Sequence, residues 1–185
     1  YSLLKTGKDE YGISFPLILR AYDDYRPALY VYFVVPMIAV FGLTAEAVRF
    51  PSVILSVCTV VSTYFLVKLI SKNEYIALLA AFLLAISPWH IYISRLGHEA
   101  NLGLSAGIIA LSFFFVAIYS KRKQWLLFIS GVWFVIALYG YQSQKIIIPI
   151  ILLTLGVIFN KELLKIKKIT VLTIIVSALL LIPLV

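Results

Sequence analysis

The sequence predicts an all-α polytopic membrane protein, and three observations support this prediction. Hydrophobic residues make up 63% of the chain and charged residues only 13%. The mean hydropathy is +1.04, and several apolar runs approach the roughly 20 residues that an α-helix needs to cross a bilayer. The charged residues gather between these runs rather than inside them. This pattern indicates membrane helices joined by short polar loops.

The apolar segments follow a mixed polar stretch over residues 1–27, and the short loops between them predict antiparallel neighbours. The first apolar stretch measures only about 24 Å as a helix, against about 30 Å of hydrocarbon, and Pro36 interrupts its hydrogen bonding. We therefore expect an interfacial or re-entrant helix there, although the count of Lys and Arg by itself mildly favours a span. The segments lie at about 28–43, 52–70, 75–93, 101–119, 125–141, 146–159 and 169–185.

Two regions follow from this reading. Residues 1–51 form the first extracytoplasmic loop with its juxtamembrane helix at about 28–43, and residues 52–185 form a bundle of about six spans. The chain begins at Tyr1 rather than Met and ends inside the apolar run Val171–Val185. We expect an internal piece of a longer protein, with an incomplete last span.

The basic residues predict the orientation of the bundle. They occupy three alternate loops, which the positive-inside rule assigns to the cytoplasm. The net charge of +8 is explained by this placement and does not indicate binding of nucleic acid. The loops at about 44–51, 94–100 and 140–146 then face the outside. The basic loop residues are Lys68 and Lys72, Lys121-Arg122-Lys123, and Lys161, Lys165, Lys167 and Lys168.

The most polar of the outer loops follows Ser87-Pro88 and contains His90, Arg95, His98 and Glu99. Ionisable side chains are expensive in hydrocarbon, about 2.5–3.5 kcal/mol each, so their presence at a span end indicates a functional site. Arg95 and Glu99 would share a face if this stretch is one helix.

Four motifs in order along the chain resemble a known family. They are Arg26-Pro27-Ala28-Leu29-Tyr30, then Phe41-Gly42 with Arg49-Phe50-Pro51-Ser52, then Ser94-Arg95 with Glu99, and Tyr139-Gly140-Tyr141-Gln142-Ser143 with Lys145 and Pro149. Together they resemble the lipid-dependent glycosyltransferases of the GT-C fold, namely the dolichyl-phosphate-mannose protein mannosyltransferases and the bacterial aminoarabinose transferases.

The resemblance implies a GT-C-like transmembrane bundle with an outer juxtamembrane helix. It implies transfer of a sugar from a polyprenyl-phosphate donor to a glycan, lipid or protein acceptor. The reaction would take place on the extracytoplasmic side of a multi-pass protein of the bacterial cell membrane, with no cofactor. Members carry an essential acid after their first transmembrane helix, and we expect that acid upstream of Tyr1, so this piece by itself would lack it.

Carboxylate and basic side chains are the main site candidates. Glu99 is the candidate catalytic carboxylate, since a general base must accept the proton of an acceptor hydroxyl; the alternative is an ion pair with Arg95. Arg26, Arg95 and Lys145 are candidates for binding the lipid phosphate through charge-assisted hydrogen bonds. Snorkelling toward headgroups is the alternative for these three residues.

Further substrate-binding candidates surround these charges. Tyr30 and Arg49 lie in motif positions, and for Arg49 a structural pair with Glu46 is equally plausible. Tyr139, Tyr141 and Gln142 suit a sugar pocket, or alternatively an aromatic belt. His98 could help to hold substrate. No HxxxH or HExxH spacing supports a metal site, and a divalent ion remains unsupported.

A transporter or flippase segment is the alternative function. It predicts polar residues at mid-membrane on several helices, whereas these runs contain mostly Ser and Thr, such as Ser56, Thr59 and Ser62.

The predicted topology can be tested by cysteine labelling. In full-length protein without Cys58, single cysteines at positions 24 and 99 should both react with a membrane-impermeant maleimide added from outside, because both positions flank the outer site. Labelling of position 24 from the cytoplasm would show that residues 28–43 span the membrane.

Overall fold

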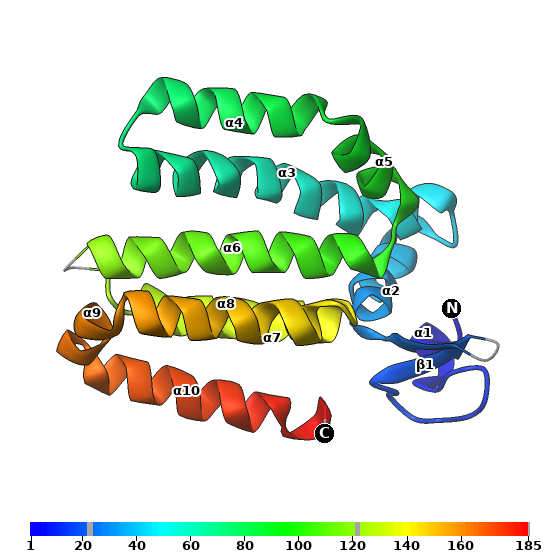
Figure 1. Cartoon of the computed structure of the whole chain (residues 1–185). Coiled ribbons are helices and arrows are strands. Elements are labelled where there is room, and N and C mark those ends of the chain that lie inside the picture. Colours follow the sequence, from blue (N-terminus) through cyan, green and yellow to red (C-terminus); the bar gives the residue numbers. More distant parts are fainter. Residues whose placement is uncertain (22–23, 121–122, 185) are drawn as a thin grey trace.

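The computed structural model describes residues 1–21, 24–120 and 123–184, and it is an all-α bundle, as the sequence predicts (Figure 1). Lys121 and Arg122 of the second basic loop, together with Val185, lie outside the described residues. The elements are α1 (Ser2–Thr6), β1 (Ile18–Ala21), β2 (Asp24–Pro27), α2 (Leu29–Phe41), α3 (Ala45–Ser71), α4 (Glu74–Ile86), α5 (Pro88–Leu96), α6 (Glu99–Tyr119), α7 (Leu126–Gly140), α8 (Gln144–Ile158), α9 (Asn160–Lys165), α10 (Lys167–Leu181) and the 3₁₀ turn η1 (Ile182–Leu184).

Two of the described helices, α3 and α6, are each long and apolar enough to cross a membrane. The pair α4 and α5 would make a third span if the two are counted together. Helices α2, α7 and α8 are apolar but shorter. The bundle of about six spans therefore stays a prediction. Helix α3 begins at Ala45, so the proposed boundary at residue 51 falls inside it.

The predicted segment 75–93 is not one straight helix. It is divided at Ser87, and the axes of α4 and α5 differ in direction by 55°. Pro88 causes the break, because proline has no N–H to donate and disfavours helical geometry in the residue before it. Ser87 accordingly has extended backbone angles, and Pro88 begins the new helix.

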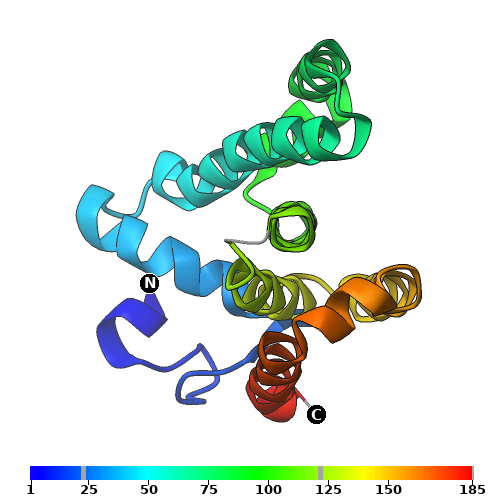
Figure 2. The same ribbon diagram turned by 90° about the vertical axis from the view of Figure 1, so that its left-hand side faces the viewer.

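The lysine-rich loops lie at one end of the bundle, and the loops that contain the predicted site lie at the other end (Figure 1). The turn between α3 and α4, the start of α7 and helix α9 lie at one end, with the basic residues Lys68, Lys72, Lys123 and Lys161. Helix α5, the start of α6 and the loop between α7 and α8 lie at the other end. Helix α2 lies across that second end rather than along the bundle (Figures 1 and 2), and residues 1–21 lie beside it.

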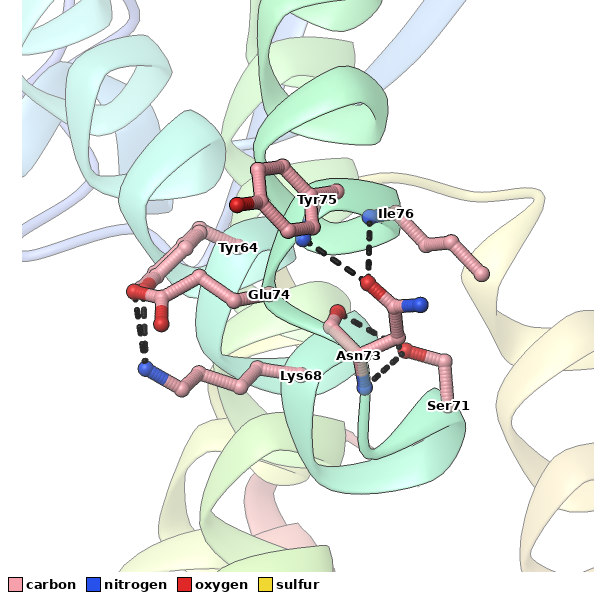
Figure 3. Close-up of polar contacts among 7 residues, drawn as sticks. All are labelled: Tyr64, Lys68, Ser71, Asn73, Glu74, Tyr75 and Ile76. Carbon is pink, nitrogen blue, oxygen red and sulfur yellow. Dashed lines mark hydrogen bonds and ion pairs between the residues drawn. The ribbon is translucent and has the colours of Figure 1, made fainter.

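Polar contacts close the turn between α3 and α4 (Figure 3). The Asn73 side chain caps α4 by accepting from the backbone N–H groups of Tyr75 and Ile76. The Lys68 Nζ donates to Glu74 at 3.2 Å and to the Tyr64 hydroxyl at 3.0 Å. Lys68 therefore both marks the basic end and joins the two helices.

Helices α6 and α7 pack closely because two glycines meet where they cross. A Cβ atom added to Gly140 would lie 2.9 Å from the backbone of Gly103, and one added to Gly103 would lie 2.9 Å from Tyr141. The sequence predicts Gly103 and Gly107 as close-packing positions. Gly103 has this role, whereas a Cβ at Gly107 would make only an ordinary 3.7 Å contact.

Two groups of buried side chains form the core. The larger joins α6, α7 and α8 around Phe114, Phe134 and Ile148. The smaller joins α2, α3 and α6 around Tyr30, Leu55 and Leu102. Helix α6 takes part in both groups, so it is the central helix of the fold.

Replacing Gly140 by Ala should destabilise the bundle by about 1–3 kcal/mol, because the new methyl group meets backbone atoms that cannot rotate away. The matched control is Gly156→Ala on α8, where an added Cβ has no neighbour within 4 Å. Thermal unfolding in detergent measures both variants. Equal midpoints for the two variants would contradict the close crossing.

Candidate functional site

A polar pocket of about 190 Å³ lies beside the start of α6. Three segments that are distant in sequence meet there, namely the end of β2, the junction of α5 and α6, and the loop between α7 and α8. Five of the predicted site residues line this one pocket. The lining residues are Arg26, Pro27, His98, Glu99, Tyr141, Gln142 and Ser143.

The junction between α5 and α6 is a sharp change of direction built by Gly97 and His98. Gly97 ends α5 with a φ of 66°, which favours glycine. His98 then caps α6, and its Nδ1 accepts the backbone N–H of Ala100 at 3.1 Å. The same nitrogen lies 3.7 Å from Oε2 of Glu99, which is longer than a hydrogen bond.

Glu99 is the acidic group of the pocket and the first residue of α6. Its side chain is only 16% exposed, and its Oε1 lies 3.9 Å from Nη1 of Arg26. The N-terminus of α6 and the Arg26 guanidinium both attract negative charge at this point. The separation is longer than a hydrogen bond, so the pair is held close by charge rather than by direct bonding.

This geometry corrects one expectation. Arg95 and Glu99 do not share a helical face, because Gly97 turns the chain between them and Arg95 lies in the last turn of α5. Within the described part of the chain, the basic side chains that lie within 4 Å of the Glu99 carboxylate are those of Arg26 and His98. Arg95 is exposed and does not line the pocket.

A small hairpin that the sequence does not reveal carries Arg26 to the pocket. Strands β1 and β2 pair antiparallel, with Leu19 opposite Arg26. The side-chain amide of Gln142 donates to the backbone carbonyl of Tyr25, which joins the hairpin to the loop between α7 and α8. The ring of Tyr141 meets that of His98 edge to face, with centroids 6.1 Å apart. The loop therefore supports both the basic and the acidic side of the site.

Asn101 anchors the start of α6 to α3. Its Nδ2 donates to the Ser52 hydroxyl at 2.7 Å and to the Ser56 hydroxyl at 2.9 Å. One turn further, the Thr59 hydroxyl lies 2.7 Å from that of Ser105. All five side chains are buried. Asn101 is not among the residues that the sequence predicts for the site. The signal that could have found it is an amide two residues after Glu99 in an apolar run, together with hydroxyl residues three and four positions apart in the preceding run 52–70.

Tyr30 supports the junction rather than lining the pocket. Its hydroxyl donates to the Val48 carbonyl at 2.9 Å, and its ring is buried between α2 and α3. Burial raises the pKa of the Tyr30 phenol, so the group stays protonated and remains a donor. A Cβ at Gly97 would lie 3.3 Å from this hydroxyl, so Tyr30 packs directly against the turn before Glu99.

The remaining candidates lie near the same end but outside the pocket. The Tyr139 hydroxyl donates to the Leu180 carbonyl at 2.8 Å and so joins α7 to α10. Lys145 is exposed in the first turn of α8, and Arg49 is exposed near the start of α3. A role for them in binding would require contact with a ligand larger than the pocket.

The side chains that line the pocket suit the binding of an anionic group next to a hydroxyl group. The Arg26 side chain is 49% exposed and offers a planar donor set for a phosphate. Glu99 can accept a proton or a hydrogen bond from a hydroxyl. Among the described residues, His, Cys, Asp and Glu side chains form no group of three that could hold a metal ion.

Comparison with known proteins identifies one family. The family model described as dolichyl-phosphate-mannose-protein mannosyltransferase matches residues 25–185. The match begins beside Arg26 and covers every residue that lines the pocket. Searches of curated proteins and of solved structures give no significant match.

Changing Gln142 to Glu should loosen the hairpin, because the substitution removes the donor to Tyr25 and places a carboxylate against its carbonyl. Hydrogen exchange of the amides in β1 and β2 should become faster, while amides in the middle of α6 should keep their protection. Gln124→Glu, at the opposite end of the bundle, is the control. Unchanged exchange in the hairpin would show that the contact does not hold it.

Proposed function

This chain belongs to the dolichyl-phosphate-mannose-protein mannosyltransferase family of membrane glycosyltransferases, and on that basis we propose that it transfers a sugar from a polyprenyl-phosphate donor to an acceptor on the extracytoplasmic side of the cell membrane. The observation that supports this function is the pocket itself. Three separate segments bring together the guanidinium of Arg26, the carboxylate of Glu99, and the aromatic and amide side chains of Tyr141 and Gln142.

The basic side of the pocket would bind the donor phosphate. Arg26 can form charge-assisted hydrogen bonds with phosphate oxygens, and it lies in β2 and lines the pocket beside the start of α6. The donor's apolar chain would then lie along the helices. Tyr141 and Gln142 border the same space, where an aromatic face and an amide suit a hydroxylated ring.

The acidic side of the pocket would receive the acceptor hydroxyl. In the proposed reaction the hydroxyl oxygen attacks the anomeric carbon, and the bond from that carbon to the phosphate oxygen breaks. The electron pair of the broken bond leaves with the lipid phosphate. The hydroxyl proton passes to the carboxylate of Glu99. A single displacement of this kind inverts the anomeric configuration.

Hydrogen bonding inside the bundle weighs against the alternative of a transporter or flippase. Polar side chains that line a path would face a shared space. Here the Thr59 hydroxyl donates to Leu55 and contacts Ser105, and the Ser112 hydroxyl donates to the carbonyls of Ser62 and Ile108. These hydroxyls hold helices together, which is their common use in membrane bundles.

Two substitutions in the full-length protein test the site. Glu99→Gln should lower the rate of sugar transfer by about 100-fold or more, since it removes the carboxylate that accepts the proton. Arg26→Ala should lower kcat/KM by roughly 10- to 100-fold, because charged hydrogen bonds to the phosphate are lost. The assay is transfer of radiolabelled sugar from a polyprenyl-phosphate donor.

Controls for this assay come from the opposite end of the bundle. Glu162→Gln and Lys161→Ala make matched changes of charge in the first turn of α9, and they should leave transfer unchanged. Wild-type transfer by both Glu99→Gln and Arg26→Ala would refute the assignment of the pocket.

A further inference from the structure

A second cavity, of about 300 Å³, lies between α3 and the break that separates α4 from α5. It shares no lining residue with the polar pocket described above. Four valines and Ser56 on α3 form most of its wall, which is completed by the end of α4 and by α5. The principal lining residues are Val53, Val57, Val60, Val61, Ala85 and His90.

His90 is the polar group of this cavity that lacks a partner. The side chain is buried, with 7% of the residue exposed. Its Nε2 is shielded from solvent and has no hydrogen-bond partner among the described residues. Buried ring nitrogens are normally paired, because an unpaired one loses the hydrogen bond that water would provide. A ligand with a hydrogen-bonding oxygen would supply that partner.

The cavity opens toward the surroundings of the bundle. Val57 is 59% exposed, and Val53 and Val61 are each nearly half exposed on the same helix. Helix α3 is one of the two helices able to cross a membrane by itself. In a bilayer the exposed valines of α3 would face hydrocarbon, and a ligand would enter the cavity from there.

Helix α5 gives the depth at which the polar part of a ligand would lie. Trp89 and Tyr92 are exposed, with ring centroids 6.2 Å apart, and Arg95 follows at the end of the helix. Trp, Tyr and Arg concentrate at the boundary between lipid and water. His90 lies between Trp89 and Tyr92 in the same helix, so it lies near this boundary. Val60, Val61 and Ala85 lie further into the bundle, where an apolar chain would extend.

We propose that this cavity binds a glycerophospholipid of the bilayer. An oxygen of the lipid's glycerol-linked region pairs with His90 Nε2, and one chain packs along the valines of α3. The described lining residues include no Lys or Arg. A prenyl phosphate carries its charge directly on the apolar chain and would place that charge against the cavity without a cation. A glycerophospholipid has uncharged oxygens at this depth and its phosphate further out.

Lipid binding to the full-length protein in detergent tests the proposal without any sugar donor, so its outcome is independent of the proposed transfer. Dioleoylphosphatidylglycerol is titrated and bound lipid is counted by native mass spectrometry. His90→Leu keeps the size of the side chain but removes the polar partner, and it should weaken binding at least about tenfold. Val57→Phe should do the same by filling the cavity.

The matched control is Val157→Phe on α8, a valine that is 74% exposed. This variant should bind lipid like the wild type. Thermal unfolding of each variant checks that the fold is intact, and Val57→Phe decides the question if His90→Leu is unstable. Wild-type binding by both cavity variants would refute the site. Displacement of the lipid by polyprenyl phosphate at lower concentration would refute the choice of ligand.

Discussion

The close crossing of α6 and α7 is the constraint on which the polar pocket depends. Gly103 and Gly140 leave no room for a Cβ atom between the two helices. This contact brings the start of α6, with His98 and Glu99, next to the loop that begins at Tyr141. The position of the reactive side chains therefore depends on two glycines, which have no side chain of their own.

Buried hydrogen bonds complement this packing on the opposite side of α6. In a membrane, burial of apolar side chains provides little drive for helix association, so packing and hydrogen bonds decide how helices meet. Asn101 and the hydroxyls of α3 provide these bonds at the level just below Glu99. Helix α6 is consequently held from both sides at its N-terminal end, where its register matters most for the position of the carboxylate.

The sequence is a good guide to the helices and to much of the site, for identifiable reasons. Hydropathy locates apolar helices, and the alternation of loops predicts that Glu99, Tyr141 and Gln142 share an end. Chain reversals and contacts between distant residues are less visible. Gly97 separates Arg95 from Glu99, and the hairpin that carries Arg26 depends on a bond from Gln142. The residues around Tyr25 contain no pattern that would predict a hydrogen bond from a side chain 117 positions later.

The bond between Gln142 and Tyr25 also has a consequence for biosynthesis. The two residues are 117 positions apart in the chain. At about 5–20 residues per second, roughly 6–23 seconds separate the synthesis of the hairpin from that of its support. A two-stranded hairpin is at most marginally stable without further contacts. The hairpin with Arg26 is therefore synthesised early. It can form its contact with Gln142 only after α3 to α7 have been synthesised.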